Sequence, residues 1–192
     1  MDWHRPPAPS ASLCGVCFDV PEVGLLTLSI ASESHLAQAD RIWPQERRPN
    51  DLHDHWRWLK IMNGKRERFS ILHRADSRVV ALWCSEPKGP RHIESGRFYR
   101  LDYLEVAPRH RQTSVGLFVL ALVACRALEV GASGLVLGGF PIDGVHRFYT
   151  EAGGVQRNVR GWKPARDLVP YIFERSALEW LKDLADGFLD ES

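Results

Sequence analysis

The spacing of apolar residues in the first half of the chain predicts strands that alternate with two helices. Short apolar runs bounded by polar or turn-forming residues predict four strands, over 13–20, 23–31, 69–74 and 78–84. Apolar residues three and four apart then predict a helix over 32–43 that is stopped by Pro44. A second helix is predicted after Asn50, with one apolar face and an end at Asn63-Gly64.

A long strand and a buried helix dominate the second half. The strand covers 98–107 and ends at Pro108, and the helix covers 114–130 and is apolar nearly all round, which indicates burial. Shorter elements follow: a strand over 134–138, a helix over 145–152, strands over 155–160 and 168–175, and a helix opened by the capping box Ser176-x-x-Glu179. Because strands and helices are interspersed and hairpins occur, we expect an α/β (α+β) fold with a mixed sheet.

The length of 192 residues predicts one folded domain with short extensions. Proline-rich residues 1–12 are expected to form a flexible tail, 13–178 the domain, and 179–192 a C-terminal helix extension packed on it. The longest apolar run, Val115–Cys125, is far shorter than the roughly 20 residues of a membrane span, so no membrane contact is expected. The four cysteines lack the spacing of a disulfide scaffold or a zinc site, which favours reduced thiols and a cytoplasmic location.

Charge is balanced overall but uneven along the chain. The net charge is +1, which argues against a nucleic-acid scaffold or a polybasic membrane protein. Residues 41–111 nevertheless sum to +7, between ends that sum to −4 (residues 1–40) and −5 (residues 167–192). This basic middle indicates a site for an anionic ligand, and the alternative is a solvated surface with chance clustering.

The turn between the long strand and the buried helix is the segment with the clearest chemistry. The first amides of a helix have no intrahelical partner, and the helix dipole adds partial positive charge at that end. Arg109, His110 and Arg111 surround this helix start. The arrangement favours a cradle for phosphate or pyrophosphate. The alternative is an ordinary turn whose arginines face water.

Two half-motifs in order resemble a known family. Val106-x-Pro108-x-x-Arg111-x-x-Ser114-x-Gly116 resembles the acetyl-CoA signature of the GNAT superfamily of N-acetyltransferases. Downstream, Phe148-Tyr149-Thr-Glu-Ala-Gly153 is similar to the family's tyrosine helix, and residues 171–178 are similar to its final strand. The resemblance covers about residues 67–178. It departs from the family pattern at Ser114, which replaces a glycine, at Gly154, and in lacking an asparagine before the tyrosine helix.

The resemblance implies a fold and a cofactor. The fold is a mixed, mostly antiparallel central sheet with helices on both faces, in which the strands matching 98–107 and 135–138 splay apart to admit acyl-CoA. Acetyl-CoA is the implied co-substrate. The implied cofactor-binding residues are Leu104, Val106, Arg109, His110, Arg111, Gln112, Thr113, Ser114, Val115 and Gly116.

The resemblance also implies a direct transfer of the acetyl group to a primary amine. Tyr149 is the implied general acid for the leaving thiolate. A carboxylate on the long strand is the implied base, and Asp102 and Glu105 are the candidates. The odd spacing of these two residues places them on opposite strand faces, so at most one is expected to face the acceptor, and we favour Asp102. A surface salt bridge is the alternative for either carboxylate.

Other readings stay open. One is a non-catalytic GNAT-like module that binds acyl-CoA. Another is transfer to an RNA-linked or protein amine, suggested by the run Trp56-Arg-Trp-Leu-Lys60 with Lys65-Arg66-x-Arg68. The acceptor could be a small molecule, a peptide or an RNA-linked amine, a homodimer is left open, and the acid–base balance of 41–60 disfavours a polycation. No metal site is predicted, because His53 and His55 would face nearly opposite sides of a helix.

Overall fold

The computed structural model describes residues 14–49, 51–63, 67–87, 89–92, 96–165 and 167–189, so the predicted tail 1–12 lies outside the described residues. The strands are β1 (Cys17–Val20), β2 (Gly24–Ile30), β3 (Glu67–His73), β4 (Val79–Glu86), β5 (Arg91–His92), β6 (Gly96–Val106), β7 (Gly134–Gly139), β8 (Val155–Gln156) and β9 (Val169–Glu174). The helices are α1 (Glu33–Glu46), α2 (Trp58–Ile61), α3 (Val115–Glu129), α4 (Asp143–Glu151) and α5 (Arg175–Asp186), with the 3-10 turn η1 (Pro108–His110).

The strands form one sheet in the order β1-β2-β3-β4-β6-β7-β9-β8, with β5 paired to β6 at one end. Among the described strands β6 and β7 pair in parallel and the other neighbours are antiparallel. This is the predicted mixed, mostly antiparallel sheet. No helix in these described ranges is long and apolar enough to cross a membrane.

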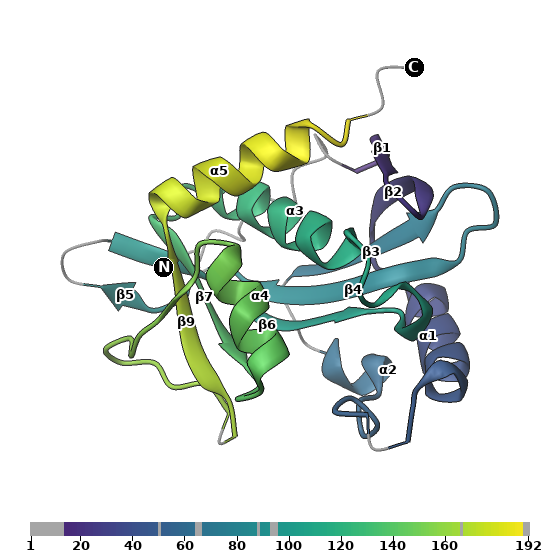
Figure 1. The fold of residues 1–192 in the computed structure, drawn as a ribbon, viewed down its shortest axis with the longest axis horizontal. Coiled ribbons are helices and arrows are strands. Elements are labelled where there is room, and N and C mark those ends of the chain that lie inside the picture. The colour runs from purple at the N-terminus through teal and green to yellow at the C-terminus, as the bar shows by residue number, and fades with distance from the viewer. Residues whose placement is uncertain are drawn as a thin grey trace, which may run out of the picture.

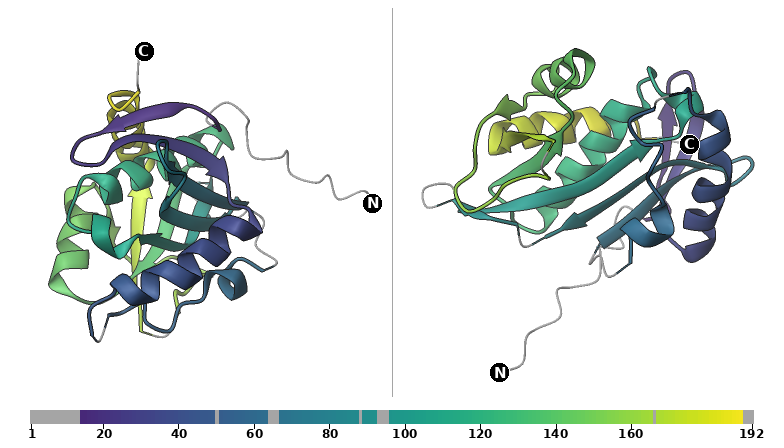
Figure 2. Two further views of the ribbon diagram at one scale, coloured as in Figure 1. Left: turned by 90° about the vertical axis from the view of Figure 1, so that its right-hand side faces the viewer. Right: turned by 90° about the horizontal axis from the view of Figure 1, so that it is seen from below.

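Helices cover both faces of the sheet, as predicted (Figure 1). The alternation along β4 shows the division, because Trp83 packs in the core beneath α3 and α5, whereas Leu82 packs in a second core beneath α1 and α2. Helix α3 lies in the centre of the first core, and its predicted all-round burial is confirmed for residues 118–127. The two further views in Figure 2 show the sheet between these helix layers.

Helix α1 runs past the proline that was predicted to stop it. Pro44 lies inside the last turn of α1, which continues to Glu46. The side-chain amide of Gln45 donates to the Arg41 carbonyl at 3.0 Å, and the Arg47 amide donates to the Trp43 carbonyl at 3.1 Å. These two bonds hold the last turn of the helix together, although Pro44 has no N–H to donate within it. The predicted stop at Pro44 is therefore wrong.

Two other expectations about helix starts are also wrong. The second predicted helix is a single turn, α2, and residues 51–57 form turns in which the Asp51 side chain accepts from the His53 amide at 2.9 Å. The last helix begins at Arg175, directly after β9, with Glu174 at its N-cap and no side-chain cap bond. The predicted capping box at Ser176 therefore does not open the helix, and α5 packs against α3.

Candidate functional site

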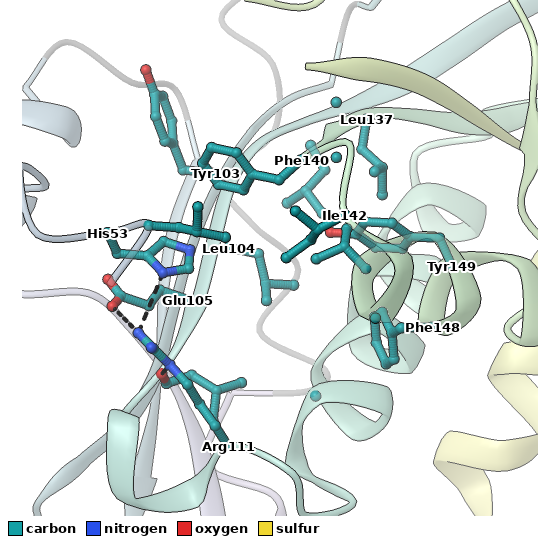
Figure 3. Close-up of a pocket in the computed structure, with 18 of the residues that line it drawn as sticks. His53, Tyr103, Leu104, Glu105, Arg111, Leu137, Phe140, Ile142, Phe148 and Tyr149 are labelled. Atoms are coloured by element: carbon teal, nitrogen blue, oxygen red, sulfur yellow. Dashed lines mark hydrogen bonds and ion pairs between the residues drawn. The ribbon is translucent and has the colours of Figure 1, made fainter. Parts of the chain in front are cut away.

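Strands β6 and β7 separate in the middle of the sheet. Their pairing runs from Phe98 with Gly134 to Leu101 with Leu137 and stops there. Beyond this point β6 continues beside β4 alone as far as Val106. A cavity of about 600 Å³ opens at the divergence, lined by residues of both strands, the turn before α3, and α4. Figure 3 shows Tyr149 and Phe148 on one side of the cavity and His53, Glu105 and Arg111 on the other.

A β-bulge lies where the two strands separate. Along β4, Ser85 pairs with Leu101 and Cys84 pairs with Tyr103, so Asp102 has no partner in the register. The extra residue shifts the alternation of side chains along the rest of β6. Leu101 and Leu104 accordingly pack in the same core although they are three residues apart. The same shift removes the expected separation of Asp102 and Glu105, which both line the cavity, so the expectation that they face opposite sides is wrong. Local sequence spacing does not reveal a bulge.

Asp102 stands in an ion pair at the cavity wall. Its carboxylate accepts from Arg100 Nε at 2.6 Å and from Arg100 Nη2 at 3.3 Å. The side chain of Asp102 is 11% exposed, against 31% for that of Arg100, so the carboxylate is the more enclosed partner. Asp102 thus lines the cavity as the enclosed carboxylate of an ion pair.

Glu105 is the centre of a buried ionic network. Its oxygens accept from Arg47 Nη2 at 2.9 and 3.1 Å, from Arg111 Nη2 at 2.8 Å and from the Trp58 indole at 2.9 Å. Burial raises the pKa of Glu105, while Arg47, Trp58 and Arg111 counteract that rise. Since removal of one member would leave buried charge unpaired, this carboxylate fixes the positions of both arginines.

The predicted cationic cradle is organised differently from the expectation. Arg111 turns its guanidinium inward, where Nη1 contacts Asp51 and Nη2 donates to Glu105. Arg109 donates to Glu46 at 3.0 Å, so its charge is also paired. The positive end that remains at this turn is therefore the backbone start of α3 rather than the two arginine side chains.

Most of the residues predicted to bind acetyl-CoA gather at the cavity. Those that line it are Leu104, Val106, His110, Arg111, Gln112, Thr113 and Gly116, whereas Arg109, Ser114 and Val115 do not. Ser114, which stands in place of a glycine, donates its hydroxyl to the Pro21 carbonyl at 3.1 Å and so fastens the turn to the β1–β2 loop. Thr113 accepts from the Val115 amide at 3.3 Å and donates to the His110 carbonyl at 2.6 Å.

Tyr149 reaches the cavity from α4. Its ring packs against Tyr171 and Phe173, with centroid distances of 5.0 and 6.3 Å. Gly139 leaves room for this ring, because a Cβ there would lie 2.9 Å from the Tyr149 Cε2 atom. Burial, together with Tyr171, raises the pKa of Tyr149 to about 12, so the phenol is protonated at neutral pH. Within the described ranges its hydroxyl has no protein hydrogen-bond partner, and Figure 3 shows it pointing into the cavity.

Asp51 and His53 belong to the site, although the sequence pattern did not indicate them. The His53 Nδ1 lies 3.0 Å from Asp51 Oδ1, and Asp51 also contacts Arg111. The same Nδ1 lies 3.3 Å from Arg111 Nη2, so the tautomer of the ring decides whether it donates to Asp51 or accepts from Arg111. Burial and the nearby charge of Arg111 lower the pKa of His53 to about 4, so the ring is neutral. The signal in the sequence was Asp51-x-His53, which is a turn motif rather than a helical pair.

The two tryptophans of the basic run have different roles. Trp58 is completely buried and donates to Glu105, so it is a core residue that cannot stack on a nucleic-acid base. Trp56 is half-buried and lines the cavity. Lys65 and Arg66, also part of the predicted RNA surface, lie outside the described residues.

Comparison with known proteins identifies the fold. No family model and no curated protein matches the sequence. Among solved structures, the GNAT-family acetyltransferase of Staphylococcus aureus Mu50 matches with a TM-score of 0.57 at 13% identity, over 78% of this chain and 99% of that one. FdhC, a nucleotide-linked sugar GNAT, matches with a TM-score of 0.63 at 13% identity, over 91% and 98% of the two chains.

The ribosomal-protein-S18-alanine N-acetyltransferase of Escherichia coli matches with a TM-score of 0.55 at 15% identity, over 78% of this chain and 93% of that one. Sequence identities this low support a conclusion about the fold alone. The chain therefore has the fold of the GNAT acetyltransferases, which confirms the resemblance of the two half-motifs.

Proposed function

We propose that this chain is an acetyl-CoA-dependent N-acetyltransferase that moves an acetyl group to a primary amine by direct attack. One observation carries the proposal: the cavity between β6 and β7 holds Tyr149, Asp102 and the start of α3 within one space. The fold alone supports acyl transfer in general, and the polar groups of the cavity supply the reasons for the finer statement.

The residues present fit acetyl-CoA. The helix α3 is 15 residues long, so its first amides and its dipole favour a pyrophosphate at the turn of Gln112 and Thr113. From Asp102 to Val106 the β7-facing edge of β6 has no strand partner, which leaves backbone groups for the pantetheine arm and the thioester carbonyl. Gly116 faces the cavity and has no side chain to block this approach.

The chemistry then follows from the polar groups on the two sides. Acetyl-CoA supplies the activated acetyl carbon. The amine nitrogen forms the new C–N bond, and its proton passes to Asp102, a carboxylate that lines the cavity. The C–S bond breaks, Tyr149 donates a hydrogen bond to the departing thiolate, and the proton that the amine gave up neutralises this thiolate as it leaves as the CoA thiol. Glu105, whose oxygens already accept four hydrogen bonds, holds Arg47 and Arg111 in place instead of acting as the base.

Calorimetry with acetyl-CoA and a thiol-release assay test the proposal together. Gly116→Val is the informative variant, because a Cβ at Gly116 lies 3.7 Å from Phe148, which is an ordinary van der Waals distance. We expect the wild type to bind acetyl-CoA and release thiol with amines, and Gly116→Val to lose binding at an unchanged Tm. Equal binding by Gly116→Val would refute the site assignment. Binding without thiol release for any small-molecule, peptide or tRNA amine would identify the chain as an acyl-CoA-binding module.

A further inference from the structure

Four aromatic rings form a continuous wall on the side of the cavity opposite Tyr149. We call His53, Trp56, Tyr103 and Phe140 the aromatic wall. The His53 ring meets Phe140 at a centroid distance of 5.8 Å and Trp56 at 4.4 Å, and Trp56 meets Tyr103 at 5.2 Å. The interplanar angles lie between 81° and 89°, so each contact is edge to face.

The aromatic wall spans the opening between the two separated strands. Tyr103 comes from β6, directly after the bulge at Asp102, Phe140 follows the end of β7, and the other two rings come from the turns before α2. Figure 3 shows His53, Tyr103 and Phe140 beside Leu104, with Tyr149 across the cavity. A molecule that rests on this wall therefore shares the cavity with Asp102 and has Tyr149 on its other side.

The charges around this space cancel. Three of the charged side chains that line the cavity in the described ranges are held in enclosed ion pairs: Asp102 with Arg100, Glu105 with Arg47, and Arg111 with Asp51. The fourth, Arg147, is 79% exposed and lies 3.9 Å from Glu151, so its charge is in solvent at the rim. The His53 ring is neutral because burial and Arg111 lower its pKa to about 4. The enclosed part of the space thus offers apolar ring surface and no unpaired charge for a second ionic group of an acceptor.

Resting on the acetyl transfer proposed above, we propose that the acceptor is a primary amine attached to an aromatic group and carrying no second charge. The ring of the acceptor packs on Trp56, Tyr103 and Phe140, and its amine lies beside Asp102. A polyamine has cationic groups that no free carboxylate of the cavity matches. An acceptor with a phosphate has anionic groups that no free guanidinium in the enclosed part of the cavity matches, because the guanidinium of Arg111 is already paired there.

Aromatic side chains in this arrangement distinguish aromatic from saturated acceptors by the geometry of the ring contacts as well as by the apolar area that is buried. Rings that stand edge to face interact through the positive edge of one ring and the negative face of the next. An aromatic acceptor can continue this pattern, whereas a saturated ring of similar size can only add apolar contact. The matched pair 2-phenylethylamine and 2-cyclohexylethylamine tests this difference, and spermidine tests the exclusion of a polycation.

The test measures kcat/KM for these three amines by thiol release, and the binding of 2-phenylethylamine by calorimetry with acetyl-CoA present. We expect 2-phenylethylamine to exceed 2-cyclohexylethylamine by about fivefold and spermidine by about a hundredfold or more. Trp56→Leu and Phe140→Leu should each lower kcat/KM for 2-phenylethylamine about tenfold, with the KM of acetyl-CoA unchanged. Trp180→Leu, at an exposed position of α5 outside the cavity, is the control for losing a tryptophan.

The outcomes separate this inference from the proposed function. Acetylation of 2-cyclohexylethylamine or spermidine as efficiently as 2-phenylethylamine overturns the inference and leaves acetyl transfer standing. Equal kcat/KM in the wild type and in both wall variants also overturns it. If the wild type does not bind acetyl-CoA, the proposed function is overturned, and calorimetry with 2-phenylethylamine alone then decides the inference. Millimolar or tighter binding of this amine that Trp56→Leu abolishes supports the inference. The absence of binding overturns it.

Discussion

Removal of the Tyr149 hydroxyl tests the proposed acid with little structural side effect. Tyr149→Phe keeps the ring between Tyr171 and Phe173, and the contact at Gly139 prevents the ring from moving toward β7. The hydroxyl has no protein hydrogen-bond partner among the described residues, so its loss leaves no orphaned group behind. We therefore expect the Tm and the affinity for acetyl-CoA to stay nearly unchanged.

The magnitude follows from the pKa of this phenol. Burial raises the pKa of Tyr149 to about 12, whereas an ordinary thiol has a pKa of about 8.5, so full proton transfer to a fully solvated thiolate would cost about 5 kcal/mol. The favourable interaction is instead a hydrogen bond to the forming thiolate, worth about 1.5–3 kcal/mol for a charged acceptor. The same burial that raises the pKa of the phenol also disfavours the thiolate, which strengthens this bond. We expect kcat to fall about 10²-fold.

The assay is single-turnover thiol release, in which chemistry limits the rate. Because the raised pKa keeps the phenol protonated until the pH nears 12, Tyr149 should cause no loss of rate as the pH rises to 10. A Tyr149→Phe variant with the wild-type rate would show that Tyr149 only packs in the site and does not act on the leaving thiolate. A fall in the wild-type rate with an apparent pKa near 10 that Tyr149→Phe removes would contradict the burial argument.

Three further predictions concern the surroundings of the cavity. Gly139→Ala keeps the hydroxyl of Tyr149 but displaces the ring, so kcat should fall tenfold or more by thiol release, and an unchanged kcat would show that the ring position is unimportant. Glu105→Ala leaves Arg47 buried without a counter-ion, and urea unfolding should show a loss of about 3–5 kcal/mol, a loss below about 1 kcal/mol arguing against a buried network. The pKa of His53 is lowered from 6.5 to about 4 in the folded protein. Between pH 6.5 and pH 4 the unfolded chain binds a proton that the folded protein does not, so the free energy of unfolding falls as the pH falls through this range. Urea unfolding at pH 7 and pH 4 should therefore show a loss that is about 3 kcal/mol smaller in His53→Gln than in the wild type, and equal losses would contradict the burial of His53.

The sequence alone determined the parts of this protein that depend on local patterns. The strand over 98–107, the stop at Pro108 and the buried helix after Ser114 follow from hydrophobic period and proline chemistry, and the structure has β6, η1 and α3 there. The placement of Tyr149 near the cavity followed from a motif whose spacing is set by one strand and one short helix. Such signals survive in one chain, because the residues that create them are close neighbours.

Only the tertiary structure decided how the charges and rings of the site are arranged. The pairing of Glu105 with Arg47 and of Arg111 with Asp51 joins residues about sixty positions apart, and no local pattern encodes that distance. The bulge at Asp102 is a property of the register between β4 and β6, and it moved this carboxylate to the same cavity as Glu105. Residues 51–57 have a helical apolar pattern, but the bonds of the Asp51 side chain to the His53 amide and to Arg111 favour turns, and those turns bring His53 to the aromatic wall.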